Sequence, residues 1–546
     1  MSTIFIMNSI LRKKSIALLF LIFATTSVFA AEWQWSVTVN KYISSETNDH
    51  PRAFLWIPEN CKQVRAVIVG QHNMLEEGIL EHSGFRKKMA QLGIAEIWIT
   101  PGLDQVWDSK TNVQDIFNQM LDSLAAFSGY SELKYAPVIP MGHSAMATFS
   151  WNFAAQNNDR TLAVLSVHGD APSTNLTGYG RPNLDWTKLK INGIPGLMVE
   201  GEYEWWEARI EPGLNYKKAH PKSCISFLCD AGRGHFDFSE QLVEYLGLFI
   251  EKAVKYRLPK KSPMDQPVNL ISVNPQNGWL VDRWHKDRLP KAIAAPNKLY
   301  AGNRDSAFWY FDKEMAKLTE SIYARQRGKK EQYLGYVQNR ELLEFNLKHF
   351  ARYLGKFEPE ADGLTFHISP AFTDSLHAKI TNNHATTKTV ISCICGPVEK
   401  VNDSTFTVRF SRMGLNNVKR TADMCLIMNN DGDANYKSTV QQMYLHIPYP
   451  NKEGKEQKIS FDSIQDINQS VKSVDLRATA SSGMPVYYYV REGPAEIKDG
   501  KLVLTTIPPR AKFPVKVTVV AWQYGRSVEP KIQTADPVIR TFSVQK

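Results

Sequence analysis

The sequence predicts an α/β protein with a doubly wound, mostly parallel sheet, followed by all-β sandwich domains. From about residue 31 to 257, short apolar runs that suit strands alternate with amphipathic stretches that suit helices. That alternation indicates a parallel sheet covered on both faces. From about residue 360, the pattern changes to short alternating strands between turn residues, which is typical of β-sandwiches. The chain of 546 residues is long enough for about three or four domains.

Residues 1–30 have the pattern of a secretory signal peptide. Arg12, Lys13 and Lys14 precede an apolar core at 16–29, and Ala30 ends a small-residue motif that suits cleavage. The apolar core is short for a membrane span, and no later stretch is long enough. No cysteine follows it to carry a lipid. We therefore expect an exported protein, periplasmic or extracellular, that has no membrane span after signal cleavage.

Charge and cysteine content exclude some functions. The formal charge of +10 is mild for this length, and Lys and Arg are scattered, so no basic stripe indicates a nucleic-acid partner. The six cysteines have no zinc-site spacing. Cys224 and Cys229 are too far apart on one predicted strand to bridge directly. Cys393 and Cys395 share a strand face on which they could approach Cys425, but no pairing can be assigned.

The expected elements of the first domain follow in order. Strands are expected at 33–39, 53–57, 64–70, 94–100, 135–141, 161–168, 195–200 and 224–229, the first two antiparallel at a sheet edge. Helices are expected at 77–93, 109–127, 145–157 and 238–256. Ligand sites in such sheets lie at the carboxyl ends of the strands, so polar residues directly after a strand are the candidates for function.

Ser144 is the first such candidate. It follows the apolar run 138–141 and Gly142-His143, and it precedes a stretch of small and apolar residues that suits a buried helix. A serine on a sharp strand-to-helix turn has an exposed Oγ and backbone N–H groups nearby for a developing oxyanion. The alternative is an ordinary turn with Ser144 as the helix N-cap.

An acid and a histidine follow two later strands. Gly201-Glu202-Tyr203-Glu204 comes after the strand at 195–200, and Gly232-Arg233-Gly234-His235 comes after the strand at 224–229. With Gly142-His143-Ser144, these motifs resemble those of the α/β-hydrolase superfamily over about residues 31–257. The resemblance implies Ser144 as nucleophile, His235 as base and Glu204 as the acid that orients His235. Glu200, Glu202 and Asp170 are the rival acids.

The chain departs from the family pattern at two places. The second glycine of the serine motif is Met146 here, a long side chain that needs room against the preceding strand. The oxyanion loop lacks the usual His-Gly pair, and its equivalent is Gly70-Gln71-His72-Asn73-Met74. The backbone N–H groups of Asn73 and Ala145 are the expected oxyanion hole.

Aromatic side chains are frequent in the loops at this end of the sheet. Flat aromatic faces stack on sugar rings, so we expect a substrate-binding role for Trp107, Trp186, Trp205 and Trp206. The alternative is that each tryptophan anchors a long loop. His168 also follows a strand, and a hydrogen-bonded structural role is expected for it.

The second half is expected to contain no catalytic group. Residues 258–359 are expected to form a linker and a segment, with a helix at 306–325, that packs against the first domain. Filling a domain interface is the favoured role of this helix, and walling the site is the alternative. A repeat follows, in which Gly396-Pro397 and Gly493-Pro494 each precede a short strand pair. Residues 455–546 resemble bacterial immunoglobulin-like (Ig-like) repeats of exported proteins, and 360–450 do so loosely. We expect two Ig-like β-sandwich domains, at 360–450 and 451–546.

The sequence thus predicts an exported serine esterase that uses Ser144, His235 and Glu204, with no metal or organic cofactor implied. Export, Ig-like modules and tryptophan-rich loops favour acyl or methyl esters on a polysaccharide or oligosaccharide. This choice is by analogy. A peptidase or lipase would use the same triad. A non-catalytic carbohydrate-binding or adhesion protein with a degenerate hydrolase fold is the alternative that Met146 favours.

Overall fold

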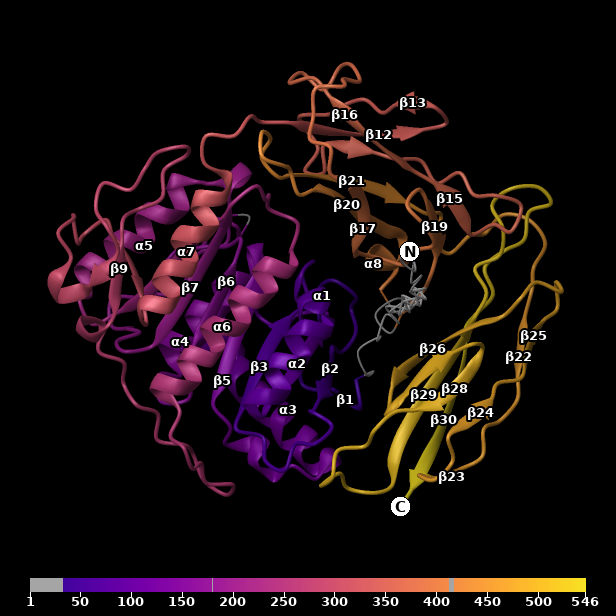
Figure 1. Cartoon of the computed structure of the whole chain (residues 1–546). Coiled ribbons are helices and arrows are strands. Elements are labelled where there is room, and N and C mark those ends of the chain that lie inside the picture. Colours follow the sequence, from indigo (N-terminus) through magenta and orange to yellow (C-terminus); the bar gives the residue numbers. More distant parts are fainter. Residues whose placement is uncertain (1–32, 179, 412–416) are drawn as a thin grey trace, which may run out of the picture.

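The computed structural model describes residues 33–178, 180–411 and 417–546. Figure 1 shows an α/β domain beside two β-rich regions. The predicted signal peptide lies outside the described residues, and so do Tyr179 and 412–416. None of the helices in the described part of the chain is both long and apolar enough to cross a lipid bilayer.

The α/β domain is built on one eight-stranded sheet with the order β1-β2-β4-β3-β5-β6-β7-β8. β2 is antiparallel to both of its neighbours, and from β4 onward all pairs are parallel. This order and these directions are those of the α/β-hydrolase fold, so the predicted fold class is confirmed. The strands are β1 Trp35–Thr38, β2 Arg52–Trp56, β3 Ala66–Gln71, β4 Ile94–Thr100, β5 Val138–His143, β6 Val164–Val167, β7 Pro195–Gly201 and β8 Cys224–Asp230.

Helices cover both faces of the sheet because alternate strand residues are apolar on each face. Phe54 and Ile68 belong to the core that contains helix residues Phe85 and Leu246, whereas Leu55 belongs to the core of the opposite face. The helices of the domain are α1 Glu76–Glu81, α2 Ser83–Leu92, α3 Val113–Ser128, α4 Ala147–Gln156, α5 Glu207–Ala219 and α6 Glu240–Arg257. Accordingly, α2 and α6 pack together on one face and α3 lies on the other.

Two helix predictions for this domain need correction. The single helix expected at 77–93 is α1 and α2, separated at His82, whose extended backbone ends α1 and whose ring accepts a hydrogen bond from Gly84 N–H. α5 was not predicted, because Pro212 lies inside it and its apolar residues form no clear stripe.

The segment after α6 forms a small sheet and one long helix. The strands are β9 Trp279–Val281, β10 Ala295–Pro296 and β11 Phe308–Tyr310. The expected helix at 306–325 is wrong at its beginning, since 308–310 is a strand and Asp312 caps α7, Lys313–Gln326. The segment contacts the α/β domain, since the Tyr310 hydroxyl donates to Phe227 O on β8.

The first β region packs a four-stranded sheet, β14-β21-β20-β17, and a three-stranded sheet, β15-β19-β18, on one core. A third sheet, β13-β12-β16, also contributes to that core. Strand pairing places residues from 333 onward in this region. The domain boundaries expected from the sequence remain predictions. The elements are β12 Tyr333–Gln338, β13 Glu341–Leu342, β14 Tyr353–Leu354, β15 Thr365–His367, β16 Ser369–Thr373, β17 Thr389–Cys395, β18 Val398–Lys400, β19 Thr405–Val408, α8 Val418–Ala422, β20 Asp423–Asn430 and β21 Thr439–His446.

The second β region repeats this topology, with sheets β23-β30-β29-β26 and β24-β28-β27 and an added β22-β25 pair. Seven strands in a four-plus-three sandwich fit the expected Ig-like class. Gly396 and Gly493 occupy equivalent turns and both have positive φ, 98° and 124°. The strands are β22 Ile459–Phe461, β23 Ile467–Asn468, β24 Ser473–Asp475, β25 Ala478–Ala480, β26 Tyr487–Glu492, β27 Ala495–Lys498, β28 Lys501–Leu504, β29 Val515–Trp522 and β30 Val538–Gln545.

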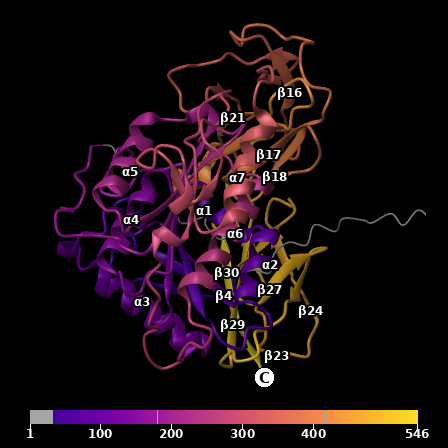
Figure 2. The same cartoon turned by 60° about the vertical axis from the view of Figure 1, so that its left-hand side comes forward.

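Both β regions contact the α/β domain. In Figures 1 and 2 the first region lies over one end of the domain and the second lies beside its lower part. At the first contact, the Lys437 ammonium, 1% exposed, forms an ion pair with Glu202 at 2.7 Å. At the second, Gly493 N–H donates to Trp33 O at 2.9 Å. All six cysteines are free thiols, and Cys395 faces Cys425 across β17 and β20, as the sequence pattern allowed.

Candidate active site

Ser144 lies on a strained turn between β5 and α4. Its φ of 52° is in the left-handed region, which a non-glycine residue adopts at a cost. Gly142 permits the turn, since an added Cβ would lie 2.1 Å from Met146 O. Room for Met146 comes from Gly102, where an added Cβ would lie 2.9 Å from the Met146 Cε. The departure from the family glycine is therefore compensated by a glycine on another loop.

His235 lies within hydrogen-bonding distance of Ser144. Its Nε2 is 2.9 Å from the Ser144 Oγ, and its Nδ1 hydrogen-bonds to a carboxylate oxygen of Glu204. His143 supports this loop from behind, because its Nε2–H donates to His235 O at 2.9 Å. Burial lowers the pKa of His143 well below its usual range, which keeps that ring neutral. Side chains from the ends of β5, β7 and β8 thus meet in one hydrogen-bonded chain.

Glu204 bridges two histidines. Its second oxygen hydrogen-bonds to Nδ1 of His168, a fully buried residue at the end of β6 with φ of 50°. Burial alone would raise the pKa of Glu204, but the charges of His168 and His235 outweigh it and lower that pKa. Burial opposes protonation of His168, yet the Glu204 carboxylate raises the pKa of that ring. His168 and Glu204 therefore form a buried ion pair behind His235.

The rival acids are held elsewhere. Glu200 pairs with the Arg209 guanidinium at 3.1 Å, and Asp170 lies 3.8 Å from the same group. Glu202 pairs with Lys437 and accepts a hydrogen bond from Gly232 N–H at 2.8 Å. Among the four acids considered from the sequence, Glu204 is the one that hydrogen-bonds to His235.

The expected oxyanion loop has a different hydrogen-bonding pattern from the one predicted. The Asn73 N–H donates to Oε2 of Glu76 at 3.0 Å, so it is engaged and not available for an oxyanion. Glu76 also accepts from His143 N–H at 2.7 Å, and burial raises the pKa of its carboxyl to about 7. Met74 follows Asn73 in the same loop and lines the cavity beside Ser144. Ala145, the other expected donor, directly follows Ser144 at the start of the helical turn.

A residue of the first β region fixes this loop. Arg420, from α8, donates from Nη1 to Asn73 O at 2.5 Å and pairs through Nε with Glu46 at 2.7 Å. The position of the loop beside Ser144 therefore depends on a side chain almost 350 residues further along the chain.

Ser144 and His235 open into a cavity of about 700 Å³ with two walls. One wall belongs to the α/β domain and the other to the first β region, which contributes Gln332, Tyr333, Leu334, Phe345, Phe350, Arg352, His377, Thr439, Val440, Gln441 and Gln442. This volume is typical of small-molecule sites. Part of this wall comes from 258–359, the segment that the sequence analysis considered as a possible wall of the site. The contribution of His377 and of β21 was not expected, because strands far apart in the chain supply this lining.

Of the four tryptophans expected to bind substrate, Trp206 alone lines this cavity. Its ring stacks on His235 with centroids 6.2 Å apart, and the Arg209 guanidinium lies 4.0 Å from its centroid. Trp107, Trp186 and Trp205 lie outside the cavity lining, so the substrate-binding role predicted for them is wrong. Trp107 is fully buried among Phe117, Phe149 and Phe153, Trp186 hydrogen-bonds to Asn152 and packs on Tyr216, and Trp205 packs on Trp284.

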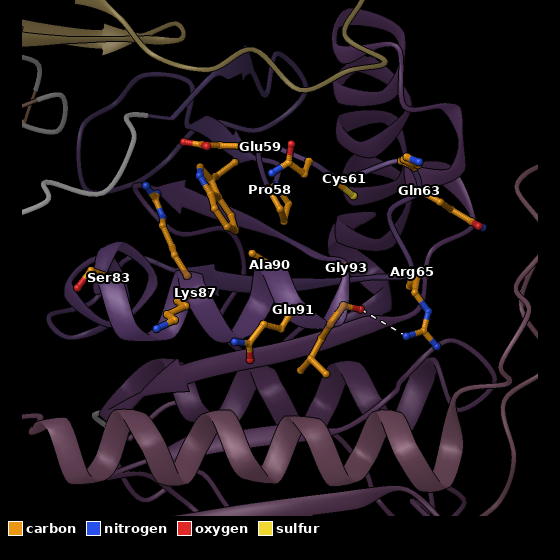
Figure 3. A pocket seen from close by; sticks show the side chains of 15 residues that line it. Pro58, Glu59, Cys61, Gln63, Arg65, Ser83, Lys87, Ala90, Gln91 and Gly93 are labelled. Carbon is orange, nitrogen blue, oxygen red and sulfur yellow. Dashed lines mark hydrogen bonds between the residues drawn. The ribbon is translucent and has the colours of Figure 1, made fainter.

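A second cavity of about 820 Å³ lies at the opposite end of the sheet (Figure 3). Arg65 and Gly93, which line it, directly precede β3 and β4, whereas Ser144 follows β5. Lys87 and Gln91 of α2 form one side. It contains no paired nucleophile and base. Within the described ranges, no group of His, Cys, Asp and Glu side chains is arranged to hold a metal ion.

Comparison with known proteins gives matches at the level of structure. No family model matches the chain, and no curated protein sequence matches it. Similar solved structures include a dienelactone hydrolase from Anabaena variabilis, with 13% identity over 42% of this chain and 100% of that chain and a TM-score of 0.27. A fluorophosphonate-binding serine hydrolase F from Staphylococcus aureus has 12% identity over 40% and 97%, with a TM-score of 0.28. A monoglyceride lipase from Saccharomyces cerevisiae has 9% identity over 41% and 96%, with a TM-score of 0.27. At these scores the fold assignment rests on the strand order of this chain.

Proposed function

We propose that the protein is an exported serine hydrolase that cleaves carboxylic esters, with acyl or methyl esters on polysaccharides as its substrates. The observation that carries the proposal is the continuous hydrogen-bonded chain from Ser144 through His235 to Glu204. A serine hydroxyl is a weak nucleophile at neutral pH and needs such a base beside it.

The reaction follows from the positions of the three side chains. His235 Nε2 takes the proton of Ser144 as the Oγ attacks the ester carbonyl, and the C–O bond to the alcohol breaks as His235 protonates the leaving oxygen. Water then attacks the acyl-enzyme with His235 as base again, which releases the acid and restores Ser144. Glu204 accepts from Nδ1 throughout and stabilises the imidazolium.

The electrostatics support His235 as the base. Burial lowers the pKa of its ring below the usual value of 6.5, although Glu204 opposes this. The neutral form that accepts a proton therefore predominates at neutral pH. Our candidates for the oxyanion hole are the backbone N–H groups of Ala145 and Met74. Met74, from the 72–74 loop, replaces Asn73, whose N–H donates to Glu76.

The substrate class is supported by the cavity and by Trp206. The cavity is large enough for a sugar unit, and Trp206 offers a half-exposed ring at its edge. Export, which the signal peptide pattern predicts, would bring the protein to polysaccharides outside the cytoplasm. The alternative of a non-catalytic protein with a degenerate hydrolase fold rested on Met146. Gly102 provides space for that side chain, so this argument is weakened.

The test is labelling of the purified protein with a fluorophosphonate probe, which modifies base-activated serines. We expect labelling of the native protein and of Ser131→Ala, an exposed serine outside the cavity, and none of Ser144→Ala. Ester hydrolysis should vanish with the labelling. A well-folded native protein that neither reacts nor hydrolyses acetylated or methylated glycans would rule out the proposal.

A further inference from the structure

The cavity contains two arginines with opposite surroundings. Arg209 is 1% exposed and lies against the carboxylates of Glu200, Asp170 and Glu204. Arg352, on the opposite wall, forms no ion pair within the described residues, and its guanidinium donates to Leu347 O alone. The first arginine is neutralised by its neighbours, whereas the charge of the second remains available to a ligand.

From this contrast we infer that the site takes esters that carry an anionic group near the scissile bond, and that Arg352 binds that group. The ester part of this inference rests on the proposed function. A guanidinium presents a planar set of donors that matches a carboxylate or a sulfate with two parallel hydrogen bonds.

The loop that carries Arg352 is held in place. Gln441 and Gln442 of β21 donate side-chain hydrogen bonds to Ala351 O and Phe350 O. The Phe350 ring also packs on Phe236, next to His235, with centroids 5.4 Å apart. The loop therefore contacts the segment that carries the base, which fixes Arg352 relative to the reacting groups.

The backbone of Arg352 is held in a closed turn. Its φ is 66°, a left-handed conformation that costs free energy for an arginine. Asn346 N–H donates to Arg352 O at 2.7 Å, and Arg352 N–H donates to His349 O at 3.0 Å, so the turn is closed on both sides. The two hydrogen bonds fix the position of the Arg352 backbone in the cavity wall.

Among the described residues that line the cavity, no carboxylate competes for Arg352. Glu204 is engaged by His168 and His235. Asp237, the other acid that lines the cavity, accepts from Gly234 N–H at 3.0 Å and lies 3.5 Å from the Arg233 guanidinium. An incoming anion therefore meets a cation without having to displace a protein carboxylate.

Combined with a glycan ester, this charge points to acidic polysaccharides as the substrate class. Two sources have the required chemistry, the carboxylate of a uronic acid and a sulfate group on a sugar. Both place a negative charge within one sugar unit of an ester.

The first experiment compares a charged and a neutral ester. We expect kcat/KM for 4-acetoxybenzoate, relative to that for its neutral methyl ester, to fall about 10- to 100-fold in Arg352→Gln, mainly through KM. Arg340→Gln is the matched control, since Arg340 is exposed on the same region, has φ of 68° and lies outside the cavity. An unchanged ratio in Arg352→Gln would overturn the inference.

The second experiment measures binding without catalysis. Ser144→Ala and the double variant Ser144→Ala with Arg352→Gln are titrated by calorimetry with oligogalacturonate, with a sulfated oligosaccharide and with a neutral oligosaccharide of equal length. Weaker binding of one anionic ligand, by about tenfold or more, in the double variant supports the inference and identifies the source of the anion. Equal affinity of both variants for all three ligands contradicts it. If binding of an anionic ligand depends on Arg352 but the native protein hydrolyses no ester, the anion site stands and the proposed function is wrong.

Discussion

The two walls of the cavity differ in how their polar side chains are used. On the α/β side, the ionisable groups hydrogen-bond to one another, as in the chain from Ser144 to His168. On the β side, Arg352 is left without a charged partner in the described chain. In the proposed function, the α/β wall would move a proton and the β wall would bind a ligand. The β region therefore lines the cavity beside Ser144 and is more than a spacer.

The largest expected effect is at the centre of the α/β wall. Glu204→Gln should lower kcat by about 10³- to 10⁴-fold, because an uncharged side chain neither stabilises the imidazolium of His235 nor fixes its tautomer. The measurement is steady-state hydrolysis of a neutral aryl ester. Glu202→Gln is the control, since Glu202 pairs with Lys437, and it should keep most of kcat while lowering thermal stability. Equal rates for Glu204→Gln and the native protein would move the acid role to another residue.

His168→Gln tests the second histidine through pH. In the native protein the acid limb of kcat/KM should lie below pH 6.5, because burial lowers the pKa of His235. The charge of His168 contributes to that lowering, so its removal should shift the limb to higher pH and reduce kcat/KM about tenfold at pH 6. His446→Gln, at an exposed histidine, should leave the profile in place.

The same variant should alter stability with a defined sign. The pKa of folded His168 lies above its unfolded value near 6.5, so its ion pair with Glu204 stabilises fully below that pH and loses its effect as pH rises through the folded value. The difference in Tm between native protein and His168→Gln should therefore be larger at pH 6 than at pH 9. A pH-independent difference would contradict the ion pair.

Arg420→Gln tests whether the β region supports the chemistry. Loss of the hydrogen bond to Asn73 O should loosen the loop beside Ser144 and reduce kcat about tenfold, with a small change in KM. Arg409→Gln, which removes an exposed pair with Glu399, should have no effect on kcat. A rise in KM with unchanged kcat would instead indicate that Arg420 acts on substrate binding.

The smallest effect is expected at the turn that holds Ser144. Gly102→Ala would bring a methyl group to 2.9 Å from the Met146 side chain and should destabilise the protein by about 1–3 kcal/mol, with a several-fold loss of activity. Met146→Ala opens that space, so the double variant should recover most of the loss. The measurement is a double-mutant cycle on unfolding free energy and kcat. Additive losses would show that the two residues are independent.

The hydrolase fold and the order of Ser144, Glu204 and His235 could be predicted because each follows a strand of clear apolar pattern. The choice of Glu204 over Glu202 followed from family spacing, since burial and partners are invisible in the sequence. His168 was expected to be structural, and its contact with Glu204 depends on strands β6 and β7 lying side by side. Trp107 could not be separated from Trp206, because a tryptophan in a core and one in a cavity have the same local sequence signal. Arg352 and Arg420 were missed, since only folding brings their region to Ser144.

The buried pair of Lys437 and Glu202 has a consequence for how the protein is made. The ribosome completes Glu202 more than 200 residues before it reaches Lys437. At about 5–20 residues per second, that is an interval on the order of 10 to 50 s. During this interval the nascent α/β domain exposes Glu202, the loop at Asn73 and half of an open cleft. The cavity is therefore completed late in biosynthesis, and a premature stop codon, even far downstream of His235, would yield a chain whose cavity lacks one wall.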